Sequence, residues 1–473
     1  MTISILTAFI LYFAVLAAIA FIVHKRTKRA SDFMLGGRSM NYFVTAIAAQ
    51  ASDMSSWLFL AFPAAIFSNG LFEFWTAIGL ITFMYLNWTY IAPRLRVATQ
   101  EYNALTLSSF LSRRFHDAKG LISLTCAVFS IFFFTIYIAS ALLGISRLFK
   151  GAFELDLVSS ILIGAFIALV YTNIGGFLAV AWCNVFKGLF MLAVIVAVPL
   201  LAMNYVGPIS NILGKLHKAG SLTLFPADKS ILTSLLLVCG WGLGYFGQPH
   251  ILIYFMSIDD VKKITYSKYI GIAWMAIALT AAAATGLIGI VHFGHNLPIP
   301  ETLFIELAKA LFNPFFAGVA LCGIFAATLA TMNNHILISG SVFAEDFYKR
   351  FFNRTLSSEG QVTAARIGSF LICLCAVAFI LIGKPDSIYS LVAYAWSGLG
   401  SAFGPILLVS LYSKRVTYAA ALLGILTGGI VAALWPLLNT NIMPMVAGFF
   451  SSFIVIILIS LVTYPLKKER IHE

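Results

Sequence analysis

Long apolar runs separated by short polar segments occupy nearly all 473 residues of the chain. A hydrocarbon layer ~30 Å thick is crossed by about 20 apolar residues in an α-helix. This rule predicts thirteen membrane-spanning helices. They cover residues 3–23, 42–68, 72–93, 121–149, 157–175, 179–203, 231–256, 267–293, 313–343, 363–382, 387–412, 416–437 and 444–464. The pattern therefore predicts an all-α polytopic membrane protein that forms a single membrane domain over residues 1–473.

Two of the predicted spans contain residues that weaken a helix. Span 42–68 reads "AQASDMSS" around Asp53, and a carboxylate in the middle of an apolar run is costly and marks a functional position by default. Span 231–256 reads "CGWGLGYFGQPH", in which several glycines precede Pro249. Glycine lowers helix stability and proline removes a backbone donor. Both helices are therefore predicted to be interrupted.

The positions of the two weakened spans indicate an internal repeat. Five spans within 42–203 and five within 231–412 each begin with a weakened helix. Because five is odd, the two sets cross the bilayer in opposite directions, which predicts a leucine-transporter-type fold with two inverted five-helix repeats. The span at 3–23 and the two spans in 416–464 are then additions to this core. In such folds substrate and ion sites lie at the helix breaks near the bilayer midplane.

The distribution of charge predicts the orientation. Only 10% of residues are charged, and the formal net charge is +12. Most Lys and Arg residues lie on the side of segment 24–41, in segments 24–41, 94–119, 257–268, 344–366, 413–416 and the tail. By the positive-inside rule this side is cytoplasmic, so the N-terminus lies outside the cytoplasmic (inner) membrane and the C-terminus lies in the cytoplasm. The basic excess reports topology, and no nucleic-acid partner is expected.

Six sequence motifs occur in order along the chain: "SDFMLGGRSM", "ASDMSSWL", "FFFTIYIAS", "WGLGYFGQPHIL", "EDFYK" and "FGPILL". With these motifs the chain resembles the sodium:solute symporter family and, within it, the bacterial sodium/proline symporters. The resemblance implies a secondary active transporter that imports L-proline or a close amino or imino acid. It also implies Na⁺ as the coupling ion and no organic cofactor. The expected partners are the small-molecule substrate and membrane lipid, with no obligatory protein partner.

The resemblance also implies roles for individual residues. The positions that match the family's sodium ligands are Ala51, Met54, Ala327 and Thr331, and Asp53 belongs to the same ion-binding region. The positions that match substrate-handling residues are Ser55, Tyr137, Trp241, Tyr245, Gln248 and Pro249. The compact apolar ring of an imino acid packs well against aromatic side chains, and its charged groups need exposed backbone dipoles. If locally helical, Trp241, Tyr245 and Pro249 would share one face, because they are spaced four apart.

Three residues depart from the family pattern at the ion site. Ala330 stands where a hydroxyl residue is usual, Asn184 where an acid is usual, and Lys187 where a glutamine is usual, so the implied sodium site is incomplete. Lys187 lies roughly 12 Å along its helix from Ala179. Its ammonium could take the place of a bound sodium, since both are monovalent cations satisfied by oxygen donors. Alternatively, Lys187 could extend to the cytoplasmic face or pair with Asp53.

If the Lys187 ammonium takes the place of sodium, we expect proline transport that depends only weakly on sodium. Proton coupling or facilitated exchange would then replace sodium coupling, since a buried lysine can exchange protons near neutral pH. His335, next to Asn334, could take part in proton movement or could be a hydrogen-bonded packing residue.

Two other classes of protein remain as alternatives. One is a membrane sensor with a transporter-like domain. The other is an intramembrane enzyme, for which the chain offers no HExxH, GxSxG or paired intramembrane acids, so we expect no enzymatic activity.

Overall fold

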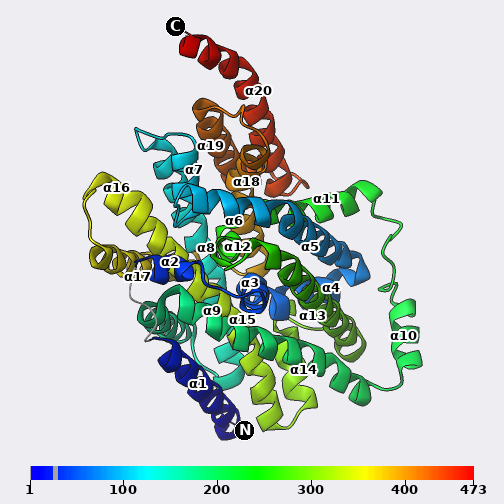
Figure 1. The fold of residues 1–473 in the computed structure, drawn as a ribbon. Helices are drawn as coiled ribbons and strands as arrows, with labels where there is room; N and C mark the ends of the chain where they lie inside the picture. Colours follow the sequence, from blue (N-terminus) through cyan, green and yellow to red (C-terminus); the bar gives the residue numbers. More distant parts are fainter. Residues whose placement is uncertain (1, 25–29, 473) are drawn as a thin grey trace.

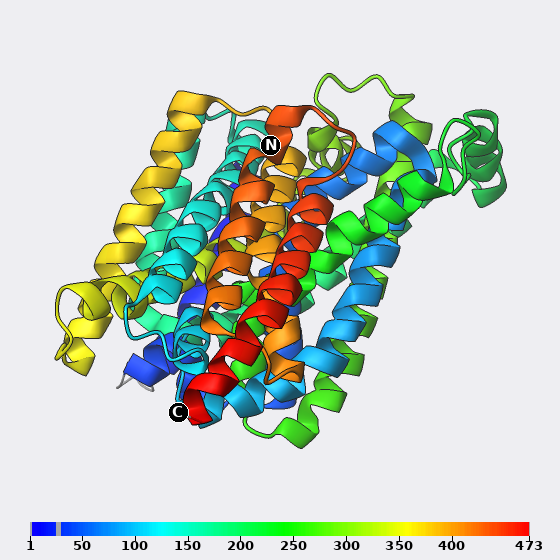
Figure 2. The same ribbon diagram turned by 90° about the horizontal axis from the view of Figure 1, so that it is seen from above.

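The computed structural model describes residues 2–24 and 30–472, and the secondary structure of this part of the chain is helical. Figure 2 shows the long helices side by side in one bundle, and Figure 1 shows α3 near its middle. In the first half of the chain the helices are α1 (Thr2–His24), α2 (Ala30–Leu35), α3 (Tyr42–Met54), α4 (Phe62–Asn69), α5 (Phe74–Leu86), α6 (Ala92–Glu101), α7 (Leu107–Arg114), α8 (Leu121–Phe153), α9 (Leu157–Val206) and α10 (Ile209–Lys218). In the second half they are α11 (Ile231–Gly242), α12 (Pro249–Ser257), α13 (Ile264–Phe293), α14 (Leu303–Leu311), α15 (Pro314–Val342), α16 (Lys349–Phe351), α17 (Ser358–Gly383), α18 (Ile388–Tyr412), α19 (Tyr418–Leu434) and α20 (Pro444–His472).

Within the described residues, nine helical segments are long and apolar enough to cross a membrane, or ten when the bent pair around Gln248 counts as one span. The predicted number of thirteen is therefore not confirmed. The apolar helices Ile3–Ile19 and Leu157–Thr172 are too short for this criterion, and the helical segment Trp57–Glu101 joins parts of two predicted spans. Helix α9 contains the predicted spans 157–175 and 179–203, with a non-helical residue at Gly176 (φ 60°) between them.

The first predicted interruption is confirmed at the end of α3. Ser55 has a φ of 49°, a left-handed conformation that an α-helix does not contain. The backbone N–H of Trp57 donates to Ser55 Oγ at 3.0 Å, so the serine side chain supports the turn. The chain then continues through a π-helical turn, Trp57–Ala61, into α4. Because α3 stops at Met54, the carbonyl groups of its last turn lack intrahelical partners.

The second predicted interruption is also confirmed. Helix α11 passes into a 3₁₀ turn, η5 (Leu243–Gly247), and α12 begins at Pro249 after a bend of 47°. Proline suits the first turn of a helix, where its missing N–H has no partner to lose. A side chain at Gly244 would collide with the indole of Trp396 on α18, so this glycine allows α18 to approach the break.

The two breaks are close together because α3 packs directly against α12. Helix α3 also contacts α9, α13 and α15, while α18 contacts η5 and α8. The breaks are thus enclosed by long helices from both halves of the chain.

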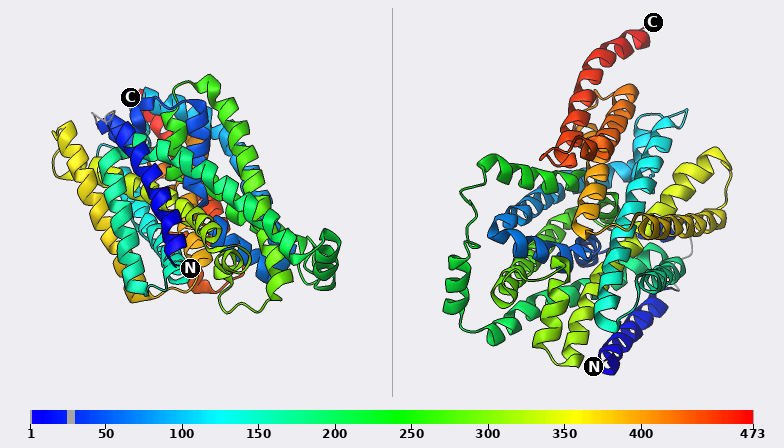
Figure 3. Two further views of the ribbon diagram at one scale, coloured as in Figure 1. Left: turned by 90° about the horizontal axis from the view of Figure 1, so that it is seen from below. Right: turned by 180° about the vertical axis from the view of Figure 1, so that it is seen from behind.

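The start of α1 and the end of α20 lie at opposite ends of the bundle, as Figures 2 and 3 show. Helix α10 and its connection to α11 project from the bundle. Part of the basic segment 24–41, residues 25–29, lies outside the described residues.

Candidate functional site

A small cavity lies between the two helix breaks. Its lining comes from both breaks and from α5, α8 and α18: Asp53, Met54, Trp57, Leu80, Tyr137, Trp241, Tyr245, Val392 and Trp396. Its volume of about 20 Å³ is room for about one water molecule. Five of the predicted substrate and ion residues therefore line one cavity: Asp53, Met54, Tyr137, Trp241 and Tyr245.

A hydrogen bond joins the two breaks inside this cavity. The hydroxyl of Tyr245 donates to Asp53 Oδ2 at 2.6 Å, and both residues are buried. This distance is typical of a hydroxyl that donates to a carboxylate. The backbone carbonyl of Tyr245 accepts a hydrogen bond from Asn87 Nδ2 at 2.9 Å, which holds the 3₁₀ turn in place. The acid in the middle of the apolar sequence thus contacts the second broken helix directly.

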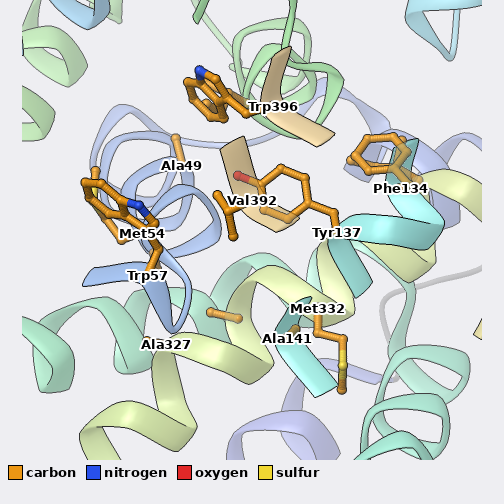
Figure 4. Packing of buried hydrophobic residues seen from close by; sticks show 14 of the residues in the cluster. Ala49, Met54, Trp57, Phe134, Tyr137, Ala141, Ala327, Met332, Val392 and Trp396 are labelled. Carbon is orange, nitrogen blue, oxygen red and sulfur yellow. The ribbon is translucent and has the colours of Figure 1, made fainter. Parts of the chain in front are cut away.

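Aromatic side chains form the walls of the cavity. The rings of Trp57 and Trp241 lie 5.1 Å apart, and Tyr245 meets Trp396 edge to face at 5.1 Å. Trp396 Nε1 donates to the carbonyl of Trp241 at 2.8 Å. Figure 4 shows Tyr137 entering from α8, with its hydroxyl directed toward Val392 and α3. These walls suit a compact apolar group, and Asp53 offers the negative charge that a cationic group requires.

The other predicted substrate residues lie outside this cavity. Ser55 supports the break of α3, and Gln248 Nε2 donates to the carbonyl of Trp396 at 2.9 Å. Pro249 lines a different cavity, together with Ile253 and Ile338. Trp241 and Tyr245, which are four residues apart, line the same cavity, whereas Pro249, four residues further on, lines another. The expected common face required a continuous helix, and the helix is interrupted before Pro249. Between Tyr245 and Pro249 the chain leaves the 3₁₀ turn and passes through the extended Gln248 (φ −85°, ψ 104°), so a spacing of four no longer keeps Pro249 on the side of Tyr245.

The predicted sodium ligands lie where α3 ends beside α15. The carbonyl groups of Ala51 and Met54 belong to the last turn of α3, which contacts α15. On α15, the hydroxyl of Thr331 is buried and has no hydrogen-bond partner among the described residues. In contrast, Thr328 Oγ1 donates to the carbonyl of Ile324 at 2.7 Å. Ala327 lies one turn before Thr331 on the same helix.

Free oxygen atoms at the end of a broken helix are the donors that sodium sites of such transporters use. The residues present therefore fit a sodium ion, and Thr331 is the side chain that carries this argument. The neighbouring Ala330 is buried and brings no hydroxyl to the site.

The two other unusual residues lie on the second half of α9. Asn184 Nδ2 donates to the hydroxyl of Tyr254 at 3.2 Å. Lys187 is fully buried, and its Nζ lies 4.6 Å from the ring centroid of Tyr171, a cation–π contact. The expectation that Lys187 extends to the cytoplasmic face is thus wrong, because its side chain reaches no surface. A pair with Asp53 is not formed either, since Nζ has no hydrogen-bond or ion-pair partner among the described residues.

The helix that carries Lys187 packs against the helix that carries Ala51 and Met54. Gly188, the chain neighbour of Lys187, packs so closely on α3 that a side chain there would lie 3.1 Å from Ala51 Cβ. The backbone of α9 beside Lys187 therefore packs against α3, while the Lys187 ammonium itself lies over the ring of Tyr171.

Sequence reasoning missed several residues of this site. Trp396 and Asn87 contact the second break from α18 and from the turn after α5. Tyr389 accepts a hydrogen bond from Trp241 Nε1 at 3.2 Å. The sequence did contain two signals of functional positions, a polar Asn87 within an apolar span and the glycines after Trp396. Neither signal indicates which helix the residue contacts.

The all-helical fold with two broken helices that face each other defines a secondary transporter of the leucine-transporter type. Solved structures support this fold class. The chain aligns with a Na⁺-coupled sialic acid symporter at a TM-score of 0.83 and 19% identity, covering 98% of both chains. It aligns with MhsT in complex with L-phenylalanine at a TM-score of 0.56 and 12% identity, covering 90% of this chain and 99% of that one.

A profile of the sodium:solute symporter family matches residues 33–428. The sodium/proline symporter of Salmonella typhimurium is 37% identical over 467 residues, which cover 96% of this chain and 92% of that protein. The osmoregulated proline transporter OpuE of Bacillus subtilis is 35% identical over 472 residues, 98% of this chain and 96% of OpuE. The chain therefore belongs to the sodium:solute symporter family and is a multi-pass membrane transporter.

Proposed function

We propose that this transporter imports L-proline, or a close amino or imino acid, and that sodium is the coupling ion. The observation that carries the proposal is the cavity between the two breaks, where Tyr137, Trp241 and Tyr245 surround the carboxylate of Asp53. The curated relatives named above are proline transporters that match nearly the full chain, which supports the same substrate class.

The chemistry of the cavity matches the parts of an imino acid. The pyrrolidine ring packs against the aromatic walls, where burial of apolar area provides the binding free energy. The ammonium group lies toward Asp53 and the free carbonyls of α3. The carboxylate requires N–H donors, which an interrupted helix exposes where it begins again. The cavity must widen to hold the substrate, because its volume of about 20 Å³ is that of one water molecule.

Sodium binding is proposed at the carbonyls of Ala51, Met54 and Ala327 and the hydroxyl of Thr331. Because α3 also carries Asp53, an ion at the end of α3 would fix the helix that holds the substrate cavity. This shared helix is the physical basis for coupling the ion gradient to substrate import.

The buried ammonium of Lys187 supports a second candidate, the same substrate class with proton-coupled or sodium-independent transport. A buried positive charge on α9, the helix that packs against α3, opposes a second cation at the end of α3, because charges interact strongly in a low-dielectric interior. The missing hydroxyl at Ala330 and the missing acid at Asn184 act in the same direction.

The proposed orientation places the N-terminus outside and the C-terminus in the cytoplasm, because the basic segments gather on one side. We assign residues 42–203 to the first repeat and 231–412 to the inverted repeat. The helix at 3–23 and the two helices in 416–464 are additions to this core.

Net uptake of radiolabelled proline into proteoliposomes tests the substrate assignment. Excess unlabelled proline should abolish uptake, an imino-acid analogue should compete, and an acidic or a large aromatic amino acid should not. Protein-free liposomes are the control. Binding of proline without net uptake would instead favour a membrane sensor with a transporter-like domain.

A further inference from the structure

A second polar cluster packs against Tyr137, which also lines the cavity of Asp53. It is centred on His250, the second residue of α12, and His335 on α15. The two imidazole rings are 4.5 Å apart and nearly perpendicular, and both are fully buried. Tyr137 contacts both rings, at 4.3 Å from His335 and 5.7 Å from His250.

The cluster contains polar atoms that have no protein partner. Among the described residues, no ring nitrogen of His250 or His335 has a hydrogen-bond partner, and the same holds for the side-chain oxygens of Gln248 and Asn334. Buried polar atoms are satisfied in the large majority of cases, so each exception needs an explanation. The packing alternative for His335, a hydrogen-bonded histidine, is contradicted by its unpartnered nitrogens.

Hydrogen bonds hold the two amide side chains so that their oxygens stay free. Asn334 Nδ2 donates to the carbonyl of His250 at 2.9 Å, and Gln248 Nε2 donates to the carbonyl of Trp396 at 2.9 Å. The cluster is therefore an ordered group of donors and acceptors. Phe134 closes it on one side, with its ring 5.0 Å from that of His335.

Residues next to the cluster line two small cavities. One is the cavity of Asp53 and Tyr245, which Tyr137 also lines. The other is lined by Pro249 and Ile253 on α12 and by Ile338, Ser341 and Val342 on α15, together with Thr106, Leu107 and Ser108 at the start of α7. Helix α15 continues from His335 through these residues toward the basic segment 344–366, and α7 lies within the basic segment 94–119.

We propose that His250 and His335, with Gln248 and Asn334, form a second, transient site for the zwitterionic head group of the substrate on its path to the cytoplasm. The proposal rests on the proposed function, because it takes an amino or imino acid as the ligand. A neutral imidazole offers one N–H donor and one acceptor. The two rings therefore supply one N–H to each oxygen of a carboxylate, and the free amide oxygens accept from the ammonium group.

Tyr137 belongs to both sites. Its ring lines the central cavity and also contacts both histidines, so a substrate that moves past it keeps one aromatic contact while its head group changes partners. The polar atoms of the histidines and amides replace the water that the charged head group loses, which lowers the cost of moving it along an otherwise apolar route. The site serves release and reloading at the cytoplasmic face, whereas the aromatic cavity serves uptake from outside.

The test compares His335→Leu, which removes the polar nitrogens, with His335→Gln, which keeps a donor and an acceptor. His250→Leu and His250→Gln form a second matched pair. His217→Leu is the control, because His217 is an exposed residue of α10. Proline transport is measured in right-side-out and inside-out membrane vesicles, which give the KM on each face.

Each leucine variant is expected to raise the KM on the cytoplasmic face and to slow proline counterflow by about tenfold or more, with the KM on the outer face changed less than about twofold. The glutamine variants should regain most of the counterflow rate. Glutamine and leucine variants that both transport like the unmodified protein would overturn the inference and leave the proposed function intact. A KM that rises equally on both faces would also overturn it. If the unmodified protein transports no proline, the proposed function fails first.

Discussion

The hydroxyl of Tyr245 and the carboxylate of Asp53 are 2.6 Å apart, and their hydrogen bond connects the two broken helices of the fold. The residues are separated by 192 positions in sequence. One comes from the end of α3 and the other from the 3₁₀ turn after α11. A ligand that binds Asp53 in place of Tyr245 therefore also removes a contact that connects Asp53 to the second break.

Replacement of Tyr245 or Trp241 by alanine should weaken proline binding by about tenfold or more, since each variant loses a large buried aromatic contact in the proposed site. Tyr245→Phe keeps the ring and removes only the bond to Asp53, so it should have a smaller effect than Tyr245→Ala. Proline binding to purified protein measures the change, with Tyr205→Ala as control because Tyr205 is exposed. Unchanged affinity in both alanine variants would exclude this cavity as the substrate site.

Asp53→Asn should reach the membrane but should fail to accumulate proline against a gradient. The amide keeps the size of the side chain and removes the charge beside the end of α3. Membrane content is measured by immunoblot and accumulation by steady-state uptake, with Asp228→Asn, an exposed loop residue, as the matched control. Normal accumulation by Asp53→Asn would leave the acid with a structural role only.

Thr331→Val should raise the sodium concentration for half-maximal uptake by about tenfold or more, because it removes the free hydroxyl of the proposed sodium site. Thr328→Val is the matched control one turn away in the same helix, since the Thr328 hydroxyl is already bonded to the carbonyl of Ile324. Sodium activation curves of the two variants provide the comparison. Equal shifts in both would show that Thr331 is not a specific ligand.

The triple substitution Lys187→Gln, Asn184→Asp and Ala330→Ser restores the residue types that are usual in the family. It should increase the sodium dependence of proline uptake, because it removes the buried ammonium from α9, the helix that packs against α3, and adds a hydroxyl and an acid. Uptake is compared in sodium and choline buffers at fixed pH, with and without an imposed proton gradient. If the triple variant and the unmodified protein respond identically to sodium, the substitutions at these three positions do not alter the coupling ion.

The sequence predicted the features that depend on local chemistry. The left-handed Ser55 and the 3₁₀ turn before Pro249 both follow from polar residues, glycines and proline placed within apolar spans. It also identified Asp53, Tyr137, Trp241 and Tyr245, which the structure brings to one cavity.

Features that depend on packing between distant helices could not be predicted in this way. Trp396 reaches the second break only because Gly244 leaves room for its indole. Pro249 could not be placed from the sequence, because the spacing pattern does not reveal that the preceding turn is 3₁₀. With that turn, the proline lines a different cavity. The ring of Tyr171, which Lys187 contacts, lies before the kink of α9 at Gly176, and Lys187 lies after it. The spacing of residues along a regular helix gives no information about a contact across a kink.

Proline uptake driven by an imposed sodium gradient tests the central claim most directly. Proteoliposomes that contain the unmodified protein are given an inward sodium gradient, the same concentration of choline, or an inward proton gradient in choline. Sodium-coupled import predicts that proline rises above its external concentration only in the first condition and that Asp53→Asn abolishes this rise. Accumulation driven equally well by the proton gradient in the absence of sodium would contradict sodium coupling and favour the Lys187-based alternative, and no proline uptake in any condition would contradict the assignment of the substrate.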